Sequence, residues 1–172
     1  MKWICCIGVS FLLSGCIPAD RLKSVSVAVG YCPGACGLTA VEIKRSLDYH
    51  YYGDNNAVLK GYYEGRFPER DWQQLESKIQ QINLIKLQPT RGRGGEEKMI
   101  ELIITEQGQS THLKCDYPNL PNVLKPLVNS LLESNKTVKL TKMSELYPFR
   151  TNFQDPETFG KPNRDRRAPA NY

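Results

Sequence analysis

The cysteines carry the most reactive chemistry in this 172-residue sequence, which contains six of them. Cys32 and Cys36 are separated by Pro33-Gly34-Ala35. In a compartment that permits disulfides, a pair this close can form a bond that clips the loop after the first predicted strand. A redox-active dithiol is the alternative, although it favours C-x-x-C at a helix N-terminus, where the pKa of a thiol falls. Unpaired or rearranged thiols are the third interpretation.

Cys115 has a different setting, in phase with Leu113 and Tyr117 on a predicted strand. A small cysteine in this position packs as an apolar residue. We therefore predict that Cys115 lies in the core. As the odd cysteine beside the Cys32 and Cys36 pair, it leaves an exchange of disulfide partners open.

The two histidines, His50 and His112, each stand alone on a predicted strand. Together with the cysteines they lack the ligand spacing of a tetrahedral zinc site, so we expect solvated or locally hydrogen-bonded histidines. The sequence contains no G-x-S-x-G, phosphate-binding loop or H-E-x-x-H. We therefore expect no catalytic residues, no metal and no cofactor.

Five tyrosines gather on two neighbouring predicted strands: Tyr49, Tyr51, Tyr52, Tyr62 and Tyr63. Successive strand residues face opposite sides of a sheet, so Tyr52 and one of Tyr62 and Tyr63 should face away from the helices. Aromatic side chains are enriched in recognition surfaces, and we predict a binding surface of Tyr52, Tyr62 and Tyr63. Cross-strand pairs that stabilise the sheet are the alternative. Tyr49 and Tyr51 should be core residues.

The N-terminus has the pattern of a secretory signal, with Lys2 before an apolar run at residues 3–13 that is too short to span a bilayer. The run ends in Leu13-Ser14-Gly15-Cys16, which is similar to the bacterial lipobox, where a diacylglycerol is attached to the cysteine through a thioether. We predict that residues 1–15 are a signal peptide and that Cys16 is lipidated. An ordinary signal peptide with a chance cysteine is the alternative.

The predicted lipid places the mature chain on a membrane of the cell envelope, through a tether at residues 16–23. Acyl chains contribute about 0.8 kcal/mol per buried methylene, so the two or three chains of a lipoprotein anchor it stably. Ile17 follows the cysteine where Asp would favour retention in the inner membrane of many Gram-negative bacteria. In such a source we expect the outer membrane, with the domain facing the periplasm.

The charge balance is mildly basic, with a formal net charge of +5 and a sequence pI of about 8.9. Nucleic-acid binding needs a basic patch or stripe, whereas these charges are spread evenly. Arg91-Gly-Arg-Gly-Gly95 runs straight into Glu96-Glu97, and we interpret it as a mobile loop. Nucleic acid is therefore not an expected partner.

Alternation of apolar and polar residues predicts the strands. They occupy residues 25–31, 41–51 with a turn at Arg45, 57–65, 98–105 and 110–117, the last two joined by a hairpin turn near Gly108. The polar even positions from Glu42 to His50 are assigned to a solvent-exposed face. One face of the sheet should therefore be buried and the other wet.

Apolar residues at spacings of three and four predict a first helix, which Pro68 can begin. Its buried stripe consists of Trp72, Leu75, Ile79 and Ile82. A second helix should begin near Asn122, because Pro126 has no N–H to donate and is tolerated in the first turn.

The order of these elements predicts an α+β fold, an antiparallel sheet of about five to six strands with two helices on one face. The domain should span residues 24–146. Residues 147–172 are rich in Pro, Asn and Arg with no period, so we predict a disordered C-terminal tail.

Several short motifs lie within residues 24–133: Cys32-x-Gly34-x-Cys36, Val41-x-Ile43, Tyr51-x-Gly53, Val58, Gly61-x-Tyr63 and Asp116-Tyr117. Together they resemble an uncharacterised bacterial envelope domain, a family of unknown function marked by C-x-G-x-C-P-x-Y, a D-G turn and Y-x-G. Gly37, Thr39 and Leu47 stand where the family has Pro, Tyr and the Gly of its turn. The resemblance implies the fold and an exported setting, and no activity.

These observations favour a non-catalytic, membrane-anchored module that binds or scaffolds another envelope protein. Two functions of other classes remain as alternatives. One is a thiol-disulfide redox protein using Cys32 and Cys36. The other is an inhibitor or immunity protein that occludes an exported toxin.

Overall fold

The computed structural model describes residues 22–30, 37–87 and 98–154. The predicted signal peptide, the lipidation site Cys16, the pair Cys32 and Cys36, and the loop at Arg91 lie outside the described residues.

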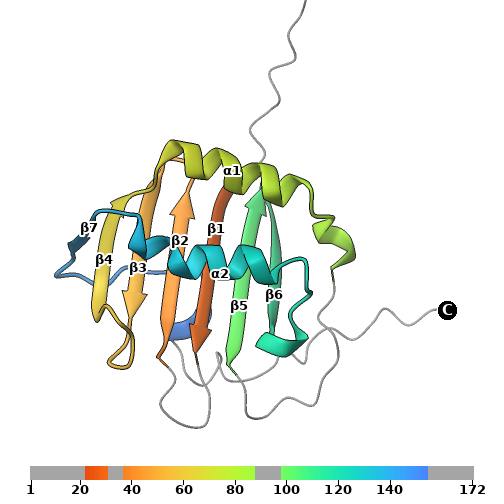
Figure 1. The fold of residues 1–172 in the computed structure, drawn as a ribbon. Coiled ribbons are helices and arrows are strands. Elements are labelled where there is room, and N and C mark those ends of the chain that lie inside the picture. Colours follow the sequence, from red (N-terminus) through yellow and green to blue (C-terminus); the bar gives the residue numbers. More distant parts are fainter. Residues whose placement is uncertain (1–21, 31–36, 88–97, 155–172) are drawn as a thin grey trace, which may run out of the picture.

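Seven strands form one antiparallel sheet in the order β6-β5-β1-β2-β3-β4-β7 (Figure 1). They are β1 Leu22–Gly30, β2 Thr39–Lys44, β3 Asp48–Gly53, β4 Gly61–Arg66, β5 Met99–Glu106, β6 Gln109–Asp116 and β7 Leu140–Lys142. The predicted α+β class and antiparallel sheet are confirmed. The count exceeds the expected five to six, because β7 has three residues and is too short to show a period.

Two positive-φ turns set the register of the hairpins. Leu47, with φ of 68°, ends the turn between β2 and β3. Gln107 and Gly108, with φ of 46° and 85°, join β5 to β6. Two consecutive residues of positive φ are typical of the two-residue hairpin turn that matches the twist of its strands. The predicted hairpin near Gly108 is confirmed.

The helices α1 Glu69–Gln80 and α2 Lys125–Glu133 cross the strands on the same face of the sheet (Figure 1). The predicted stripe of α1 is buried at Trp72, Leu75 and Ile79. α2 begins at Lys125, slightly later than expected, with Pro126 in its first turn. Short 3₁₀ helices occupy Leu84–Lys86, Tyr117–Asn119, Ser134–Lys136 and Asn152–Gln154 (η4).

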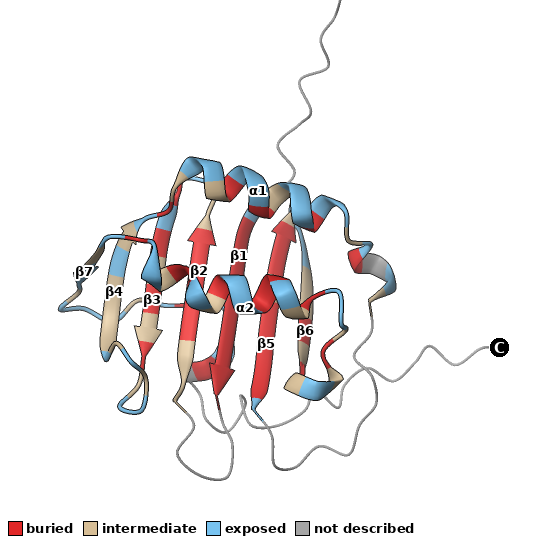
Figure 2. Cartoon of the chain, in the orientation of Figure 1, coloured by how far each residue is buried: buried red, intermediate tan, exposed pale blue. Residues whose placement is uncertain are grey.

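The main core lies between the sheet and the two helices. The odd residues of β1, such as Val25 and Val27, are buried there, and the neighbouring strands add Ile43 and Leu102 in register. Figure 2 shows β1 and β5 buried along most of their length. Tyr49, Tyr51 and Cys115 are buried in this core, as predicted.

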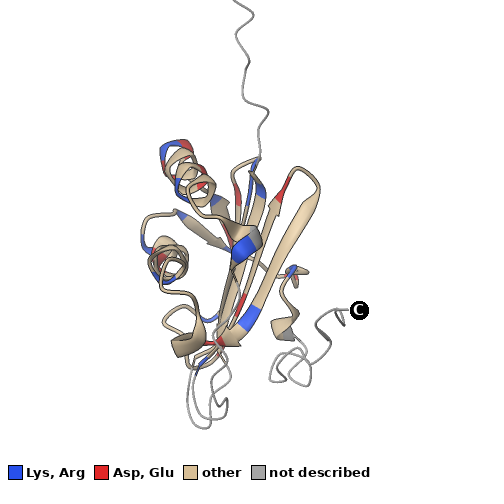
Figure 3. Ribbon diagram, turned by 90° about the vertical axis from the view of Figure 1, so that its right-hand side faces the viewer, with Lys and Arg blue, Asp and Glu red and all other residues tan. Residues whose placement is uncertain are grey.

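The opposite face of the sheet, here called the helix-free face, is covered by residues 147–154, here called the C-terminal segment. Phe149, Thr151 and Phe153 are buried, and the two phenylalanines pack on Ala28 and Ala40. In the edge-on view of Figure 3 the helices lie on one side of the sheet and the segment that ends in η4 lies on the other.

The prediction that a disordered tail begins at residue 147 is therefore wrong for residues 147–154. Composition misled it, because Pro, Asn and Arg are interleaved with aromatic residues at positions 147, 149 and 153 that share one buried side. Residues 155–172 lie outside the described part of the chain. Among the described helices, none combines the length and the apolar character needed to cross a bilayer.

Candidate functional site

Two buried carboxyl groups mark the helix-free face. Glu42 on β2 is 1 % exposed and Glu101 on β5 is 0 % exposed. The strands β2 and β5 flank β1 in the sheet. Glu42 pairs with Ser26 of β1, and Glu101 pairs with Ala28 of β1. The expectation that Glu42 faces solvent is wrong, because the C-terminal segment covers it. Burying a carboxylate is costly unless hydrogen bonds replace its water, so the partners of these two groups are informative.

Glu42 accepts hydrogen bonds from three donors. The Ser26 hydroxyl donates to Oε2 at 2.8 Å, and the backbone N–H of Arg150 donates to the same oxygen at 3.0 Å. The Tyr147 hydroxyl donates to Oε1 at 3.1 Å. Two of the three donors therefore come from the C-terminal segment.

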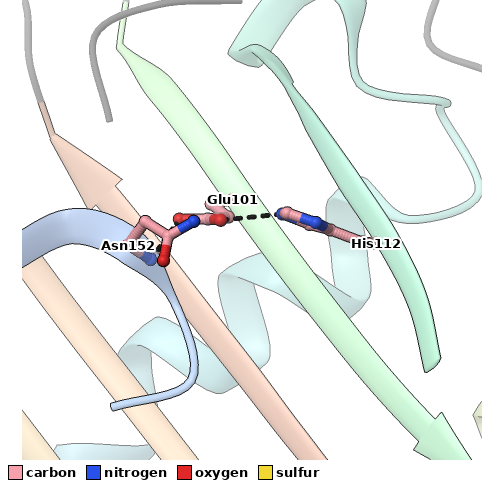
Figure 4. Close-up of polar contacts among 3 residues, drawn as sticks. All are labelled: Glu101, His112 and Asn152. Carbon is pink, nitrogen blue, oxygen red and sulfur yellow. Dashed lines mark hydrogen bonds and ion pairs between the residues drawn. The ribbon is translucent and has the colours of Figure 1, made fainter. Parts of the chain in front are cut away.

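Glu101 lies between His112 and the C-terminal segment (Figure 4). His112 Nε2 is 2.7 Å from Oε1, and the backbone N–H of Asn152 donates to Oε2 at 2.7 Å. The histidine is thus locally bonded, one of the two states predicted for it. Backbone amides two residues apart, at Arg150 and Asn152, each bind one carboxyl group.

The guanidinium group of Arg150 binds two hydroxyl groups on the same face. Its Nη1 donates to Ser24 Oγ at 2.9 Å and to Thr105 Oγ1. Both hydroxyl groups belong to buried residues. The arginine therefore adds a positive charge to the cover over a face that carries two acidic side chains.

Aromatic contacts complete the cover. Phe153 stacks on Tyr52 with ring centroids 5.1 Å apart, and Phe149 lies 6.4 Å from Tyr62. Tyr147 stacks on His50 at 3.5 Å. The small side chains of Ala28 on β1 and Ala40 on β2 pack with the two phenylalanine rings.

Three ionisable groups at this contact have shifted pKa values: Tyr147, Lys44 and His50. Burial raises the pKa of Tyr147, so its hydroxyl keeps the proton that it donates to Glu42. Its hydrogen bond to Lys44 raises the pKa of that lysine. Burial, followed by the charge of Lys44, lowers the pKa of His50, which favours a neutral ring against Tyr147.

The three tyrosines of the predicted binding surface do not share one face. Tyr52 and Tyr62 lie on the helix-free face with ring centroids 4.6 Å apart, beneath the C-terminal segment. Tyr63 packs against the main core, edge-on to Tyr51 at 6.1 Å. Strand alternation separates Tyr62 from Tyr63, so a single surface of all three is geometrically excluded.

Sequence reasoning did not single out Glu42, Glu101 or Arg150. A signal was present for Glu101, which is the one charged residue in the apolar run Met99-Ile-Glu-Leu-Ile-Ile104. A charge at such a position is expected to have a partner, since charged residues are rarely fully buried without one. The sequence could not name the partner, because Asn152 is 51 positions away.

The two carboxyl groups bind different polar side chains of the sheet. The Ser26 hydroxyl is bonded to Glu42, whereas His112 is bonded to Glu101, so these two bonds do not join a serine to a histidine. Within residues 22–30, 37–87 and 98–154, no three His, Cys, Asp or Glu side chains are grouped as metal ligands. Burial raises the pKa of Cys115 to about 11, so this thiol stays protonated and unreactive at neutral pH.

A concavity with a volume of about 350 Å³ lies between α1 and α2. Buried Phe67, Leu75 and Leu131 line it together with exposed Lys78 and Lys136. It lies in the helix layer, on the opposite side of the sheet from the helix-free face.

The fold and the site define the class of this protein: an α+β domain with an antiparallel sheet, helices on one face, and a polar face that holds a peptide segment. The chain belongs to the family described as Domain of unknown function (DUF6438), whose model matches residues 23–135. The expected membership of an uncharacterised domain family is thereby confirmed. No curated protein and no solved structure matches the chain.

Proposed function

We propose that this protein is a non-catalytic binding module of the bacterial envelope, tethered to a membrane through lipid on Cys16, that recognises another envelope protein. The observation that carries the proposal is the bonding of the helix-free face. Its buried carboxyl groups bind backbone amides of a segment that lies beyond the family-matched residues 23–135. Bonds from carboxyl groups to backbone amides hold a polypeptide segment on this face, and this supports a role in binding.

The chemistry of the face supports protein recognition. Tyrosine side chains provide apolar contact area with a polar end, and they are enriched at interfaces. Tyr52 and Tyr62 supply such area, while Ser24 and Thr105 supply hydroxyl groups that an arginine can bind. Polar groups spaced between apolar contacts favour one register of the bound partner.

The proposed tether limits where a partner can be. β1 begins at Leu22, six residues after Cys16. Six extended residues reach at most about 20 Å. The domain would therefore stay next to the membrane, and its partner would be another membrane-associated protein or one that approaches the membrane.

Site-specific photo-crosslinking in cells tests the binding function. Glu64 is exposed and pairs with His50 in register, which places it on the helix-free face beside the site. A photoreactive residue at Glu64 should capture a protein partner, and the same residue at exposed Gln73 on α1 is the control for the opposite layer. Capture from Gln73 alone, or from neither position, would contradict the proposal.

The tether is tested by Cys16→Ser. This variant should lose all labelling by a palmitate analogue and be found as an uncleaved or soluble form, because the Cys16 thiol is the proposed site of acylation. Cys115→Ser is the matched control and should keep both labelling and membrane partition. Unchanged membrane partition of Cys16→Ser would refute the lipid anchor.

A further inference from the structure

We propose that the helix-free face is a binding site for a peptide segment that carries aromatic residues around an arginine and ends in a 3₁₀ turn, and that the C-terminal segment is its intramolecular occupant. The pattern is that of Tyr147-Pro-Phe149-Arg150-Thr-Asn-Phe153, two aromatic residues, then arginine, then a third aromatic residue. This inference rests on the proposed function and specifies its surface and the chemistry of its ligand.

The occupant is separable from the domain that binds it. The family model ends at residue 135, whereas the segment begins at residue 147. β7 and Met143, whose N–H donates to the Tyr62 carbonyl at 2.8 Å, attach the chain to the sheet edge before the segment starts. The segment can therefore leave the face while its attachment to the edge strand persists.

The bonds at the centre of the site do not depend on the occupant's side chains. Glu42 and Glu101 accept the amides of Arg150 and Asn152, and any peptide that bends as residues 150–151 do and enters a 3₁₀ turn at residues 152–154 offers the same amides. Selectivity comes from the surroundings, where Ser24 and Thr105 bind the guanidinium group and Tyr52 stacks on Phe153. The same face can thus accept a separate polypeptide of matching pattern.

One feature of the occupant is unfavourable. Thr151 is 2 % exposed, and its Oγ1 has no hydrogen-bond partner among the described residues. A buried hydroxyl group without a partner costs stability, and valine has the same shape without the hydroxyl group. A ligand with valine at this position should therefore bind more tightly than the chain's own sequence does.

The experiment measures binding of a fluorescent peptide, residues 146–154 of this chain, to the full-length protein in detergent. In the wild-type protein the covalently attached segment competes, so binding should be weak. The variant Arg150→Pro with Asn152→Pro removes both amide donors from the attached segment and leaves every sheet residue unchanged. It should bind the peptide at least about tenfold more tightly, because the site is then vacant in a larger fraction of molecules.

Altered peptides then test the mode of binding on that same variant protein. Methylation of the amide nitrogens of Arg150 and Asn152 in the peptide should weaken binding at least about tenfold, because it removes both donors to the carboxyl groups. Methylation at Thr151 is the control, since its N–H has no hydrogen bond among the described residues. The peptide with Thr151→Val should bind at least about fivefold more tightly.

Several results would overturn the inference. They are equal binding by wild type and the double proline variant, and equal loss from methylation at either set of positions. A wild-type dimer that the peptide converts to monomer would show that the occupant comes from a second copy, which also overturns it. If the proline variant unfolds, Phe149→Ser with Phe153→Ser releases the segment instead, and the same criteria apply.

The outcome is independent of the crosslinking test in cells. Peptide binding by the purified protein, without any partner captured at Glu64, would support this site and refute the envelope-partner function. Partner capture at Glu64 without peptide binding would support the function and refute this ligand class.

Discussion

The two faces of the sheet are built by the same strands but are closed by different interactions. On β1, Val25 and Val27 face the helices, while Ser24 and Ser26 face the other way. The helix-covered face is apolar, so opening it would expose surface at a cost of roughly 25 cal/mol per Å². The helix-free face carries carboxyl and hydroxyl groups that water can satisfy, beside a smaller apolar cluster that includes Ala28, Ala40 and Met99. The first face is therefore a permanent core, and the second is suited to exchange its cover.

The largest expected effect lies on the helix-covered face. Tyr49 is fully buried there, burial raises its pKa, and its hydroxyl is 3.0 Å from Ser134 Oγ. Tyr49→Ala should lower the free energy of unfolding by about 3–5 kcal/mol, the range for truncating a buried aromatic side chain. The denaturation midpoint measures this effect.

The control for that experiment is Tyr49→Phe, which keeps the ring and removes the hydroxyl group. It should cost about 0.5–1.5 kcal/mol, the net value of one hydrogen bond. An alanine variant as stable as the phenylalanine variant would mean that the ring is not part of a permanent core.

The same contrast explains which features the sequence could predict. Local periodicity located α1, the β5–β6 hairpin and the buried side of β3, because each pattern is complete within one element. It also correctly placed Tyr49 and Tyr51 in the core. The three-residue strand β7 offered no such pattern.

The candidate site could be predicted less well, because periodicity says which residues share a face and not what covers that face. Glu42 was correctly placed opposite the helices, yet the group that buries it is contributed by Arg150, 108 positions later. Tyr52 and Tyr62 were found for the same local reason, while Tyr63 was assigned to their surface against the alternation of the strand.

A smaller effect is expected on the helix-free face. Phe149→Ala and Phe153→Ala should each lower the free energy of unfolding by about 1–2 kcal/mol. The double variant should cost little more than either single variant. The reason is that the segment can undock, so no set of changes within it can cost more than its docking free energy. A double-mutant cycle from denaturation midpoints measures the departure from additivity. Fully additive losses in the free energy of unfolding would show that the segment belongs to the permanent core.

The smallest effect should come from His50, which stacks on Tyr147 of the C-terminal segment. Burial and then Lys44 lower its pKa in the folded protein, while Glu42, Asp48 and Glu64 oppose that shift. In the unfolded chain its pKa returns to about 6.5. As the pH falls through that value, the unfolded state binds a proton that the folded state does not, so stability decreases with acidity until the folded-state pKa is reached.

His50→Phe keeps an aromatic ring against Tyr147 and removes the titration. Between pH 7 and pH 5 the wild-type midpoint should therefore fall further than that of His50→Phe, with His112 and the acidic residues unchanged in both proteins. Parallel pH profiles would show that the ring at position 50 is as accessible to protons in the folded state as in the unfolded chain, and that the contact with Tyr147 does not exclude water.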